Sequence, residues 1–359
     1  MECSILTFLD RLTAKATPAG TLNYTYDAAG NVASITSSNT NGASVGYTYD
    51  DVGRLSTVVD NRLGGTTTYS YDPASNVATV AYPNGLQSTF TYDSLNRLTA
   101  LNSPAAGYSY QLGPTGNRAQ ATESTGRTLN WSYDGIYRLT NEAISSDPEH
   151  VNGSVAYGLD PVGNRLTENS TLSGVNSGSF GYNADDEVST ETYDNNGNTL
   201  ATGGKTFTYD SQNRLRTMNG GAATLIYDAF GNRVVKTANS VTTRYLVDDL
   251  NPTGLPQVME EVVGGAVERV YTYGLQRISE DQIVNNAWTA SFYGYDGAGS
   301  VRQLTNAAGA VTDTYEYDAW GCASPKFHPG VMRTGFVNLT VVLAVVFGWE
   351  GAFGDHRAH

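Results

Sequence analysis

The chain alternates short segments in which aromatic and hydroxyl residues take turns with short polar segments that contain glycine or asparagine. In residues 205–210, Phe207 and Tyr209 fall on one face of an extended strand and the threonines fall on the other. A period of two is the pattern of a half-buried β-strand. Asp210 ends this segment, and its short carboxylate can accept hydrogen bonds from N–H groups two residues further on. The pattern therefore predicts a strand followed by a tight turn.

This unit recurs with a nearly constant period. Tyr295 and Tyr317 are 22 residues apart, and each ends an alternating segment with Tyr-Asp. Earlier copies of the unit, some of them degenerate, have the residue equivalent to the Tyr-Asp tyrosine at Tyr26, Tyr49, Tyr71, Tyr92, Tyr110, Tyr133, Leu159, Tyr182, Tyr193, Tyr209 and Tyr227. A fixed period in the twenties indicates a repeat architecture. We predict an all-β fold built from an array of antiparallel β-hairpins.

The turn of each unit has its own signature. Glycine at positions 30, 53, 197 and 231, and Asn213 in another copy, supply residues that tolerate a left-handed backbone. Arginine follows the aspartate by four residues in several copies, which places opposite charges on the two sides of the turn. The positions that we assign to this structural signature are Tyr26, Asp27, Gly30, Tyr49, Asp50, Arg54, Tyr92, Asp93, Arg97, Tyr209, Asp210, Arg214, Tyr295, Asp296, Tyr317 and Asp318.

The rhythm breaks between residues 245 and 261. Two prolines in this stretch predict a turn or a sheet edge before a strand resumes at Gln257–Glu261. Further strands are predicted at Val267–Ser279 and Trp288–Tyr295.

Composition supports an all-β chain and excludes one class of partner. Only 16% of the 359 residues are charged, whereas glycine occurs 39 times and tyrosine 24 times, a profile that suits strands and tight turns. The net charge of −14 argues against nucleic-acid binding, which requires a basic surface.

The ends of the chain carry few targeting or covalent signals. Cys3 and Cys322 do not form a disulfide framework or a zinc motif, and the first ten residues do not resemble a secretion signal. The apolar block Phe336–Trp349 has 14 residues, short of the roughly 20 that span a bilayer, so we expect no membrane span.

The repeated units resemble the YD repeats of bacterial Rhs proteins, of Tc-toxin cocoon components and of animal teneurins. Residues 245–258, 271–279 and 295–305 look like the Rhs-associated core in particular. The resemblance covers about residues 8–321. It implies a β-ribbon that spirals into a hollow shell, which in toxin members encloses a variable C-terminal effector. It also implies a secreted or cell-surface location.

The sequence departs from this family at its end. Cys322 stands where asparagine or arginine is usual, and the closing motif whose aspartates release the effector is absent. No residue is therefore assigned a self-cleavage role. We predict a non-repeat start at 1–7, a YD-repeat array at 8–244, a core-like segment at 245–321 and a divergent tail at 322–359, in a chain truncated at both ends.

Two alternatives to a purely structural interpretation concern the repeated side chains. The aspartates could act in paired-carboxylate hydrolysis, but their recurrence at one turn position favours turn formation. The aromatic rows, such as Tyr24 with Tyr26 and Phe207 with Tyr209, could stack on sugars, but core packing explains them as well. His356 and His359 have metal-ligand spacing, and we expect them to be a solvated tail. No cofactor, metal or catalytic residue is predicted.

Three hypotheses for function follow. The first is a non-enzymatic shell segment of a polymorphic-toxin-like protein, whose partners are the rest of the shell and an enclosed effector. The second is an adhesion module that binds carbohydrate or a cell surface. The third makes residues 322–359 a small membrane-active effector. Because exposed strand edges promote association, we also expect the isolated chain to self-associate.

Overall fold

The computed structural model describes residues 3–6 and 11–319. Several expectations lie outside these residues: the divergent tail at 322–359, the apolar block Phe336–Trp349, and the terminal histidines. Residues 1, 2 and 7 of the predicted non-repeat start also lie outside them.

The described residues are almost entirely β-strands. The first group comprises β1 (Cys3–Leu6), β2 (Leu12–Thr17), β3 (Gly20–Tyr26), β4 (Val32–Ser37), β5 (Ser44–Tyr49), β6 (Leu55–Asp60), β7 (Gly65–Tyr71), β8 (Val77–Ala81), β9 (Gln87–Tyr92), β10 (Leu98–Asn102), β11 (Gly107–Leu112), β12 (Arg118–Glu123), β13 (Thr128–Tyr133), β14 (Leu139–Ser145), β15 (Gly153–Leu159), β16 (Arg165–Ser170) and β17 (Gly178–Ser179). The second comprises β18 (Thr192–Tyr193), β19 (Thr199–Thr202), β20 (Lys205–Tyr209), β21 (Leu215–Met218), the 3-10 turn η1 (Asn219–Gly221), β22 (Ala223–Tyr227), β23 (Arg233–Ala238), β24 (Val241–Asp248), β25 (Gln257–Val263), β26 (Ala266–Tyr273), β27 (Arg277–Val284), β28 (Ala287–Tyr295), β29 (Val301–Thr305) and β30 (Val311–Thr314). The all-β prediction is confirmed.

Each strand pairs with the next one along the chain, always antiparallel. This gives one sheet of 17 strands and one of 13. The two sheets meet between β17 and β18, which are not paired with one another. The described segment between them contains an isolated antiparallel bridge between Tyr182 and Val188. The chain is therefore one long meander of hairpins, as the repeat predicts.

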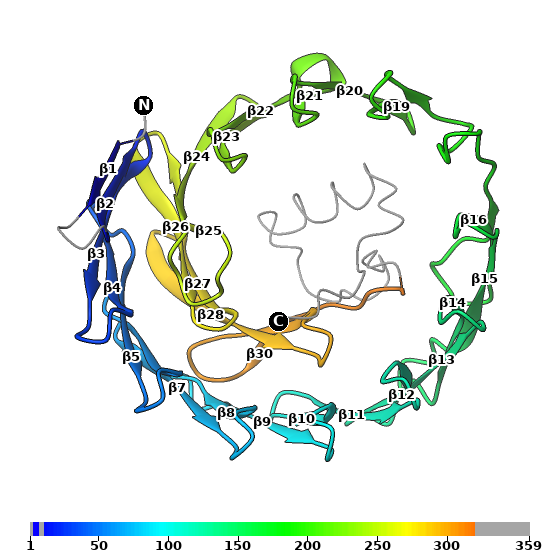
Figure 1. The fold of residues 1–359 in the computed structure, drawn as a ribbon, viewed down its shortest axis with the longest axis horizontal. Helices are drawn as coiled ribbons and strands as arrows, with labels where there is room; N and C mark the ends of the chain where they lie inside the picture. Colours follow the sequence, from blue (N-terminus) through cyan, green and yellow to red (C-terminus); the bar gives the residue numbers. More distant parts are fainter. Residues whose placement is uncertain (1–2, 7–10, 320–359) are drawn as a thin grey trace.

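The meander curves into a ring and continues past its own start (Figure 1). Strands β1 to β23 make up the circumference. The yellow and orange strands β24 to β30 then run along the inner side of the blue strands, so that part of the wall has two layers. We call β1 to β23 the outer turn and β24 to β30 the inner turn.

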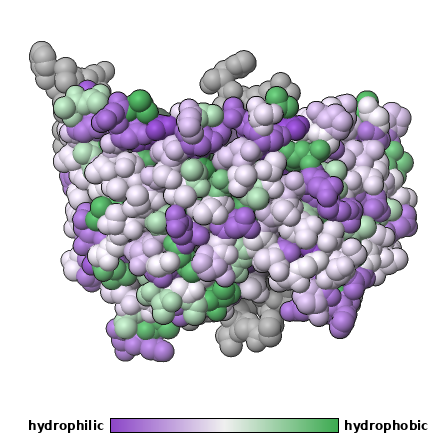
Figure 2. All heavy atoms as spheres, turned by 90° about the horizontal axis from the view of Figure 1, so that it is seen from below, coloured by the Kyte–Doolittle hydropathy of each residue, from purple (hydrophilic) through white to green (hydrophobic). Residues whose placement is uncertain are grey.

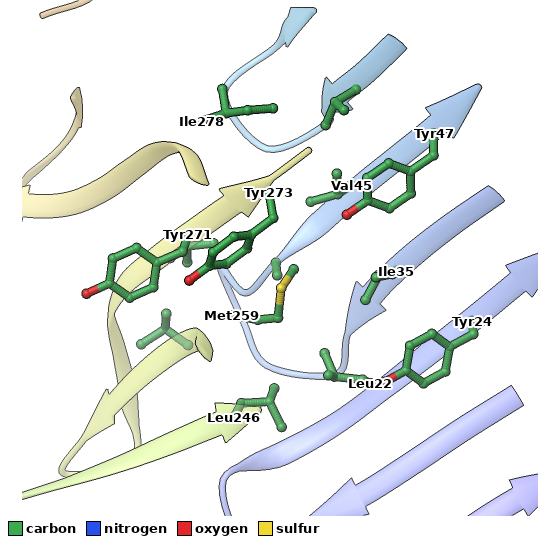
Figure 3. Packing of buried hydrophobic residues seen from close by; sticks show 14 of the residues in the cluster. Leu22, Tyr24, Ile35, Val45, Tyr47, Leu246, Met259, Tyr271, Tyr273 and Ile278 are labelled. Carbon is green, nitrogen blue, oxygen red and sulfur yellow. The ribbon is translucent and has the colours of Figure 1, made fainter. Parts of the chain in front are cut away.

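The core lies between these two layers. It combines Leu22, Ile35 and Val45 of the outer turn with Leu246 and Met259 of the inner turn, all of them at most 1% exposed. Figure 3 shows the Met259 side chain between the blue and the yellow-green strands, with Tyr273 beside it. Alternation within each strand places Leu22, Ile35 and Val45 on the inner face of the outer turn.

The other face of the outer turn is polar. Hydroxyl groups pair across neighbouring strands there, as between Thr48 and Thr57 at 2.7 Å and between Thr208 and Thr217 at 2.6 Å. Viewed at right angles to Figure 1, the wall shows mainly residues of intermediate hydropathy, with hydrophilic and hydrophobic residues scattered among them (Figure 2). No helix within 3–6 and 11–319 is long and apolar enough to cross a membrane.

Two local predictions are wrong, one in the number of strands and one in the position of a turn. The stretch Val267–Ser279 is two strands, β26 and β27, because the chain reverses at residues 274–276. The degenerate unit placed at Tyr110 is shifted by two residues: the turn runs from Gly113 to Asn117. Tyr110 occupies the buried position that Tyr24 has in its own unit, so an aromatic residue alone does not locate the turn.

Candidate functional site

The Tyr-Asp turns share one hydrogen-bond geometry. In the first, the N–H of Gly30 donates to the Asp27 carbonyl at 3.1 Å, and the N–H of Asp27 donates to the Asn31 carbonyl at 2.9 Å. Gly30 has φ of 96°. The strand pairing shifts register between Thr25 and Tyr26. This is a three-residue loop with a left-handed residue and a bulge, a common hairpin type.

The aspartate side chain stabilises this loop. The Asp93 carboxylate accepts hydrogen bonds from the N–H groups of Leu95 at 2.9 Å and Arg97 at 3.0 Å. Its other oxygen accepts from the Arg97 guanidinium at 2.7 Å, and this hydrogen bond lowers the pKa of Asp93. The same acceptor role is filled by Asp27, Asp50, Asp134, Asp160, Asp194, Asp210, Asp228 and Asp296.

The residue four after the aspartate also links successive turns. Arg54 forms an ion pair with Asp50 at 2.8 Å and donates to the Ser75 hydroxyl of the next turn at 2.9 Å. Its guanidinium also lies over the Tyr71 ring, 4.3 Å from the centroid. Similar links run from Asn76, Arg97, Arg138, Asn164, Asn198 and Arg214 to the turn that follows each of them. The turns therefore form a connected row along one rim of the ring.

The Tyr-Asp tyrosine has a role that the sequence pattern did not suggest. The Tyr49 hydroxyl donates to the Val32 carbonyl of the preceding hairpin at 3.0 Å. Equivalent bonds are made by Tyr26, Tyr71, Tyr92, Tyr133, Tyr182, Tyr209, Tyr227, Tyr273 and Tyr295. One signal was available: this position is almost always tyrosine, whereas the position two residues earlier is also Phe90, Trp131 or Phe207. A hydroxyl retained where other aromatics would fit indicates a hydrogen bond.

The last signature pair, Tyr317 and Asp318, follows β30 at the end of the described residues. The Asp296 carboxylate accepts from Ala298 and Ser300, as in the other turns.

Polar contacts join the inner turn to the outer turn. The Tyr24 hydroxyl donates to Asp248 at 2.8 Å, and Lys15 pairs with Asp249. The Glu260 carboxylate accepts from the Ala43 N–H at 2.7 Å. Further contacts are Arg62 with Asp281 at 2.9 Å, Asn84 with Thr305 at 3.0 Å, the Gly297 N–H with Tyr110 at 2.6 Å, Arg302 with Glu123 at 3.0 Å and Arg127 with Glu316 at 3.2 Å. We call this set of contacts the seam.

The seam and the layer behind it bury carboxyl groups of β24 and β27. Burial raises the pKa of Asp248 and raises the pKa of Glu280 to about 7. Burial, the neighbouring Asp60 carboxylate and a hydrogen bond to it raise the pKa of Asp281, against the opposing effect of Arg62. Desolvation favours the neutral form of a carboxyl group, so these groups hold protons at pH values where exposed carboxylates have lost them.

The described residues contain little of what an enzyme site requires. Among them there is no group of three or more His, Cys, Asp or Glu residues that could hold a metal ion. An open pocket of about 640 Å³ lies between the β2–β3 and β25–β26 turns, and Arg244 is the charged residue in its lining. The pocket offers no acid–base pair or nucleophile.

The structure distinguishes the two interpretations of the aromatic rows. Tyr24, Tyr47 and Phe207 are each at most 5% exposed, and the two tyrosines belong to the core between the layers. These three rings are buried and are not available for a sugar in solvent, whereas Tyr26, Tyr49 and Tyr209 of the same rows are partly buried. The aspartates of the Tyr-Asp turns lie one per turn and are engaged with their own loop and its Arg or Asn, so they do not form a hydrolytic pair.

Comparisons with known proteins agree with this geometry. The Teneurin YD-shell family profile matches residues 10–135. The tRNA3(Ser)-specific nuclease WapA of Bacillus spizizenii is 28% identical over 283 residues, which is 71% of this chain and 11% of that protein. The tRNA nuclease WapA of Bacillus subtilis is also 28% identical, over 281 residues with the same coverage.

Solved Tc-toxin structures share the fold. The Photorhabdus luminescens Tc holotoxin pore superposes with a TM-score of 0.69 at 14% identity, covering 90% of this chain and 19% of that one. The TcdB2-TccC3-Cdc42 structure gives a TM-score of 0.70 at 14% identity, covering 89% and 20%. The chain thus spans 11% of the length of the WapA proteins and at most 20% of these toxin chains. The repeated turns, the meander of hairpins and these relatives together support an Rhs/YD-repeat protein.

Proposed function

We propose that the chain is a non-enzymatic wall section of an Rhs-type toxin shell, which helps to enclose a C-terminal effector in a secreted or cell-surface protein. The observation that carries this proposal is the ribbon geometry. One meander of hairpins closes into a ring and is locked by an inner layer, whereas the described residues provide no catalytic group. A stiff curved wall is what an enclosing structure requires.

The contacts between repeats support a structural role for the wall. Backbone pairing, tyrosine hydroxyls and Arg or Asn links all join neighbouring hairpins. The core-like segment at 245–321 would then act as a clamp, because its strands β25 to β30 supply the inner layer that covers part of the outer turn. The array at 8–244 would form the circumference.

A protection assay tests enclosure. A protease-sensitive reporter peptide is fused after His359, and its cleavage rate is compared with that of the free peptide. The proposal predicts that cleavage is slowed at least several-fold and that denaturant restores the rate. Equal rates in native buffer would overturn enclosure. The variant Arg62→Glu, which breaks a seam ion pair, should move the rate toward that of the free peptide.

The proposal also predicts that this chain lacks the nuclease activity named for the WapA relatives. The purified chain is incubated with total tRNA and with the single tRNA species cut by a WapA protein. No cleavage above a buffer control is expected. Cleavage that co-purifies with the chain through two orthogonal columns would contradict a non-enzymatic wall.

The competing adhesion hypothesis would need a recognition surface other than the buried aromatic rows. A glycan array with the folded chain distinguishes the two functions. Specific, saturable binding to one glycan class would favour adhesion, and absence of binding leaves the wall as the function.

A further inference from the structure

The loop tips of the Tyr-Asp turns carry exposed apolar side chains. The five most exposed large hydrophobic residues in the described structure are all the second residue after the residue that opens the turn, and they are between 67% and 78% exposed. They are Val52, Leu95, Ile136, Val162 and Phe230. Single exposed hydrophobics are ordinary on a protein surface, but recurrence at one loop position on one rim is not scattered exposure. We call this position the tip.

Large and small tips alternate over six consecutive turns. In chain order the tips are Ala29, Val52, Ala74, Leu95, Thr115 and Ile136. Adjacent turns are two strands apart, so their tips are separated by roughly 10 Å. Val52 and Leu95 therefore each stand between two small tips, with space beside them at the rim.

A second observation comes from Tyr137, next to the tip Ile136. It occupies the left-handed position of its turn, with φ of 65°, where the equivalent residues include Gly30, Gly53 and Asn96. A bulky residue in this conformation is strained, and Tyr137 is still 60% exposed. The turn thus keeps an aromatic residue in an unfavourable backbone conformation, although most of that side chain is not buried in the chain's own core.

We propose that this rim binds the same rim of a second copy of the chain. A two-fold axis between the turns of Ala74 and Leu95 would place two rings face to face. Under that axis each residue meets its counterpart reciprocally, as in any isologous interface. Leu95 then faces Ala74 of the other copy, Val52 faces Thr115, and Ile136 faces Ala29.

The alternation makes this surface complementary to itself. Within these six turns, every large tip of one copy meets a small tip of the other, so large side chains enter the spaces instead of colliding. The strained Tyr137 would lie against the turn Ala28–Gly30, which has the least side-chain volume of the six. Packing of a large apolar side chain beside small residues gives the close shape complementarity that interface cores show.

Charge does not oppose this contact. Between the opening residue and the closing residue of these six turns, Asp51 is the one Asp, Glu, Lys, Arg or His. It would face the turn Gly113–Asn117, which has no charge. The opening aspartates are already engaged with their own loops. The chain's net charge of −14 is therefore not concentrated at these tips. The tips also carry no cluster of basic residues that would favour binding to an anionic surface.

Sedimentation and cross-linking test the proposal. The wild-type chain should sediment as a concentration-dependent dimer, and the exposed-tip variant Leu95→Ser should weaken dimerisation by about tenfold or more. Leu255→Ser is the control, because Leu255 is 62% exposed but is not a tip of any Tyr-Asp turn. Equal weakening by both variants, or a monomer at every concentration, would overturn the proposal.

Tyr137→Gly separates the interface from folding. Glycine relieves the left-handed strain, so this variant should unfold at a higher denaturant concentration than wild type and yet dimerise more weakly. A variant that is less stable, or one that dimerises as well as wild type, would show that Tyr137 is not retained for the interface.

Cysteine pairs test the symmetry itself. In a Cys3→Ser, Cys322→Ser background, Ala74→Cys and Leu95→Cys are made in separate chains. Mild oxidation of the mixture should give an inter-chain disulfide, whereas each chain alone should not cross-link, because the two-fold axis keeps like positions about 10 Å apart, beyond disulfide reach. Cross-linking of either chain alone would reject this dimer. So would a monomeric chain that binds phosphatidylcholine vesicles and loses that binding in the tip variant Leu95→Ser.

Discussion

At the residue scale, each Tyr-Asp turn depends on one short acceptor and one left-handed residue. The acceptor need not carry a charge: the Asn306 side chain accepts from the N–H groups of Ala308 and Ala310 in a turn of the same geometry. The left-handed position also varies, since Asn96 and Asn213 have φ of 59° where most turns have glycine. The loop is therefore specified by backbone requirements that a few residue types can meet.

The acceptor role predicts an order of stability at position 93. Asp93→Ala removes the acceptor for two N–H groups and the partner of Arg97, so it should lower the urea midpoint of unfolding. Asp93→Asn keeps the acceptor and loses an exposed ion pair, which contributes little, so it should lie close to wild type. Equal midpoints for the two variants would mean that charge, not loop hydrogen bonding, is what matters.

The left-handed position predicts a second order. Gly53 has φ of 83° with open space where a side chain would be, so only the backbone conformation resists substitution. Gly53→Ala should cost roughly 1–2 kcal/mol of unfolding free energy, and Gly53→Asn should cost less, because asparagine adopts this conformation more readily. Urea unfolding measures both. An alanine variant as stable as wild type would contradict the assigned strain.

At the element scale, local pattern and long-range packing differ in how far they can be predicted. Strand and turn in each hairpin follow from alternation and from residues such as Asp27 and Gly30. The seam does not, since the Lys15–Asp249 contact joins residues 234 positions apart and no local signal pairs them. The shift at Tyr110 shows the same limit: both candidate registers put an aromatic on the buried face, and only the turn residues Gly113 and Asn117 decide.

The packing of the inner turn on the outer turn predicts the effect of a cavity. Met259 is 0% exposed and lies between the layers (Figure 3). Met259→Ala should therefore lower the unfolding free energy by about 2–5 kcal/mol, whereas Met259→Leu, of similar volume, should cost less than about 1.5 kcal/mol. If both variants unfold like wild type in urea, the two layers are not packed on one another in solution.

At the scale of the whole molecule, the inner turn carries acidic groups that are buried in the folded wall. Glu280 is 1% exposed and contacts Tyr293 and Arg269, and Arg277 and Glu261 also act on it. Asp281 faces Arg62 and Asp60 of the outer turn. The two-layered wall should therefore respond to pH through carboxyl groups that prefer to be neutral.

The sign of that response follows from the raised pKa values. The pKa of Glu280 rises from 4.5 to about 7 in the folded chain, so the folded state holds a proton that the unfolded state has lost between these values. The stability that it contributes is complete below about pH 4.5 and is lost as the pH rises through about 7. Asp281 acts in the same direction. The turn aspartates, such as Asp93, have lowered pKa values and act in the opposite direction, at more acidic pH.

Between pH 5 and pH 8 the unfolding free energy should therefore fall, by on the order of 3 kcal/mol from Glu280 alone. Urea midpoints measured across this range in constant ionic strength test the prediction. Glu280→Gln mimics the protonated group and should flatten the profile, whereas Glu268→Gln, at an exposed site on β26, should leave it unchanged. A midpoint that rises with pH, or a slope that survives in Glu280→Gln, would show that the buried carboxyl does not control the stability of the two-layered wall.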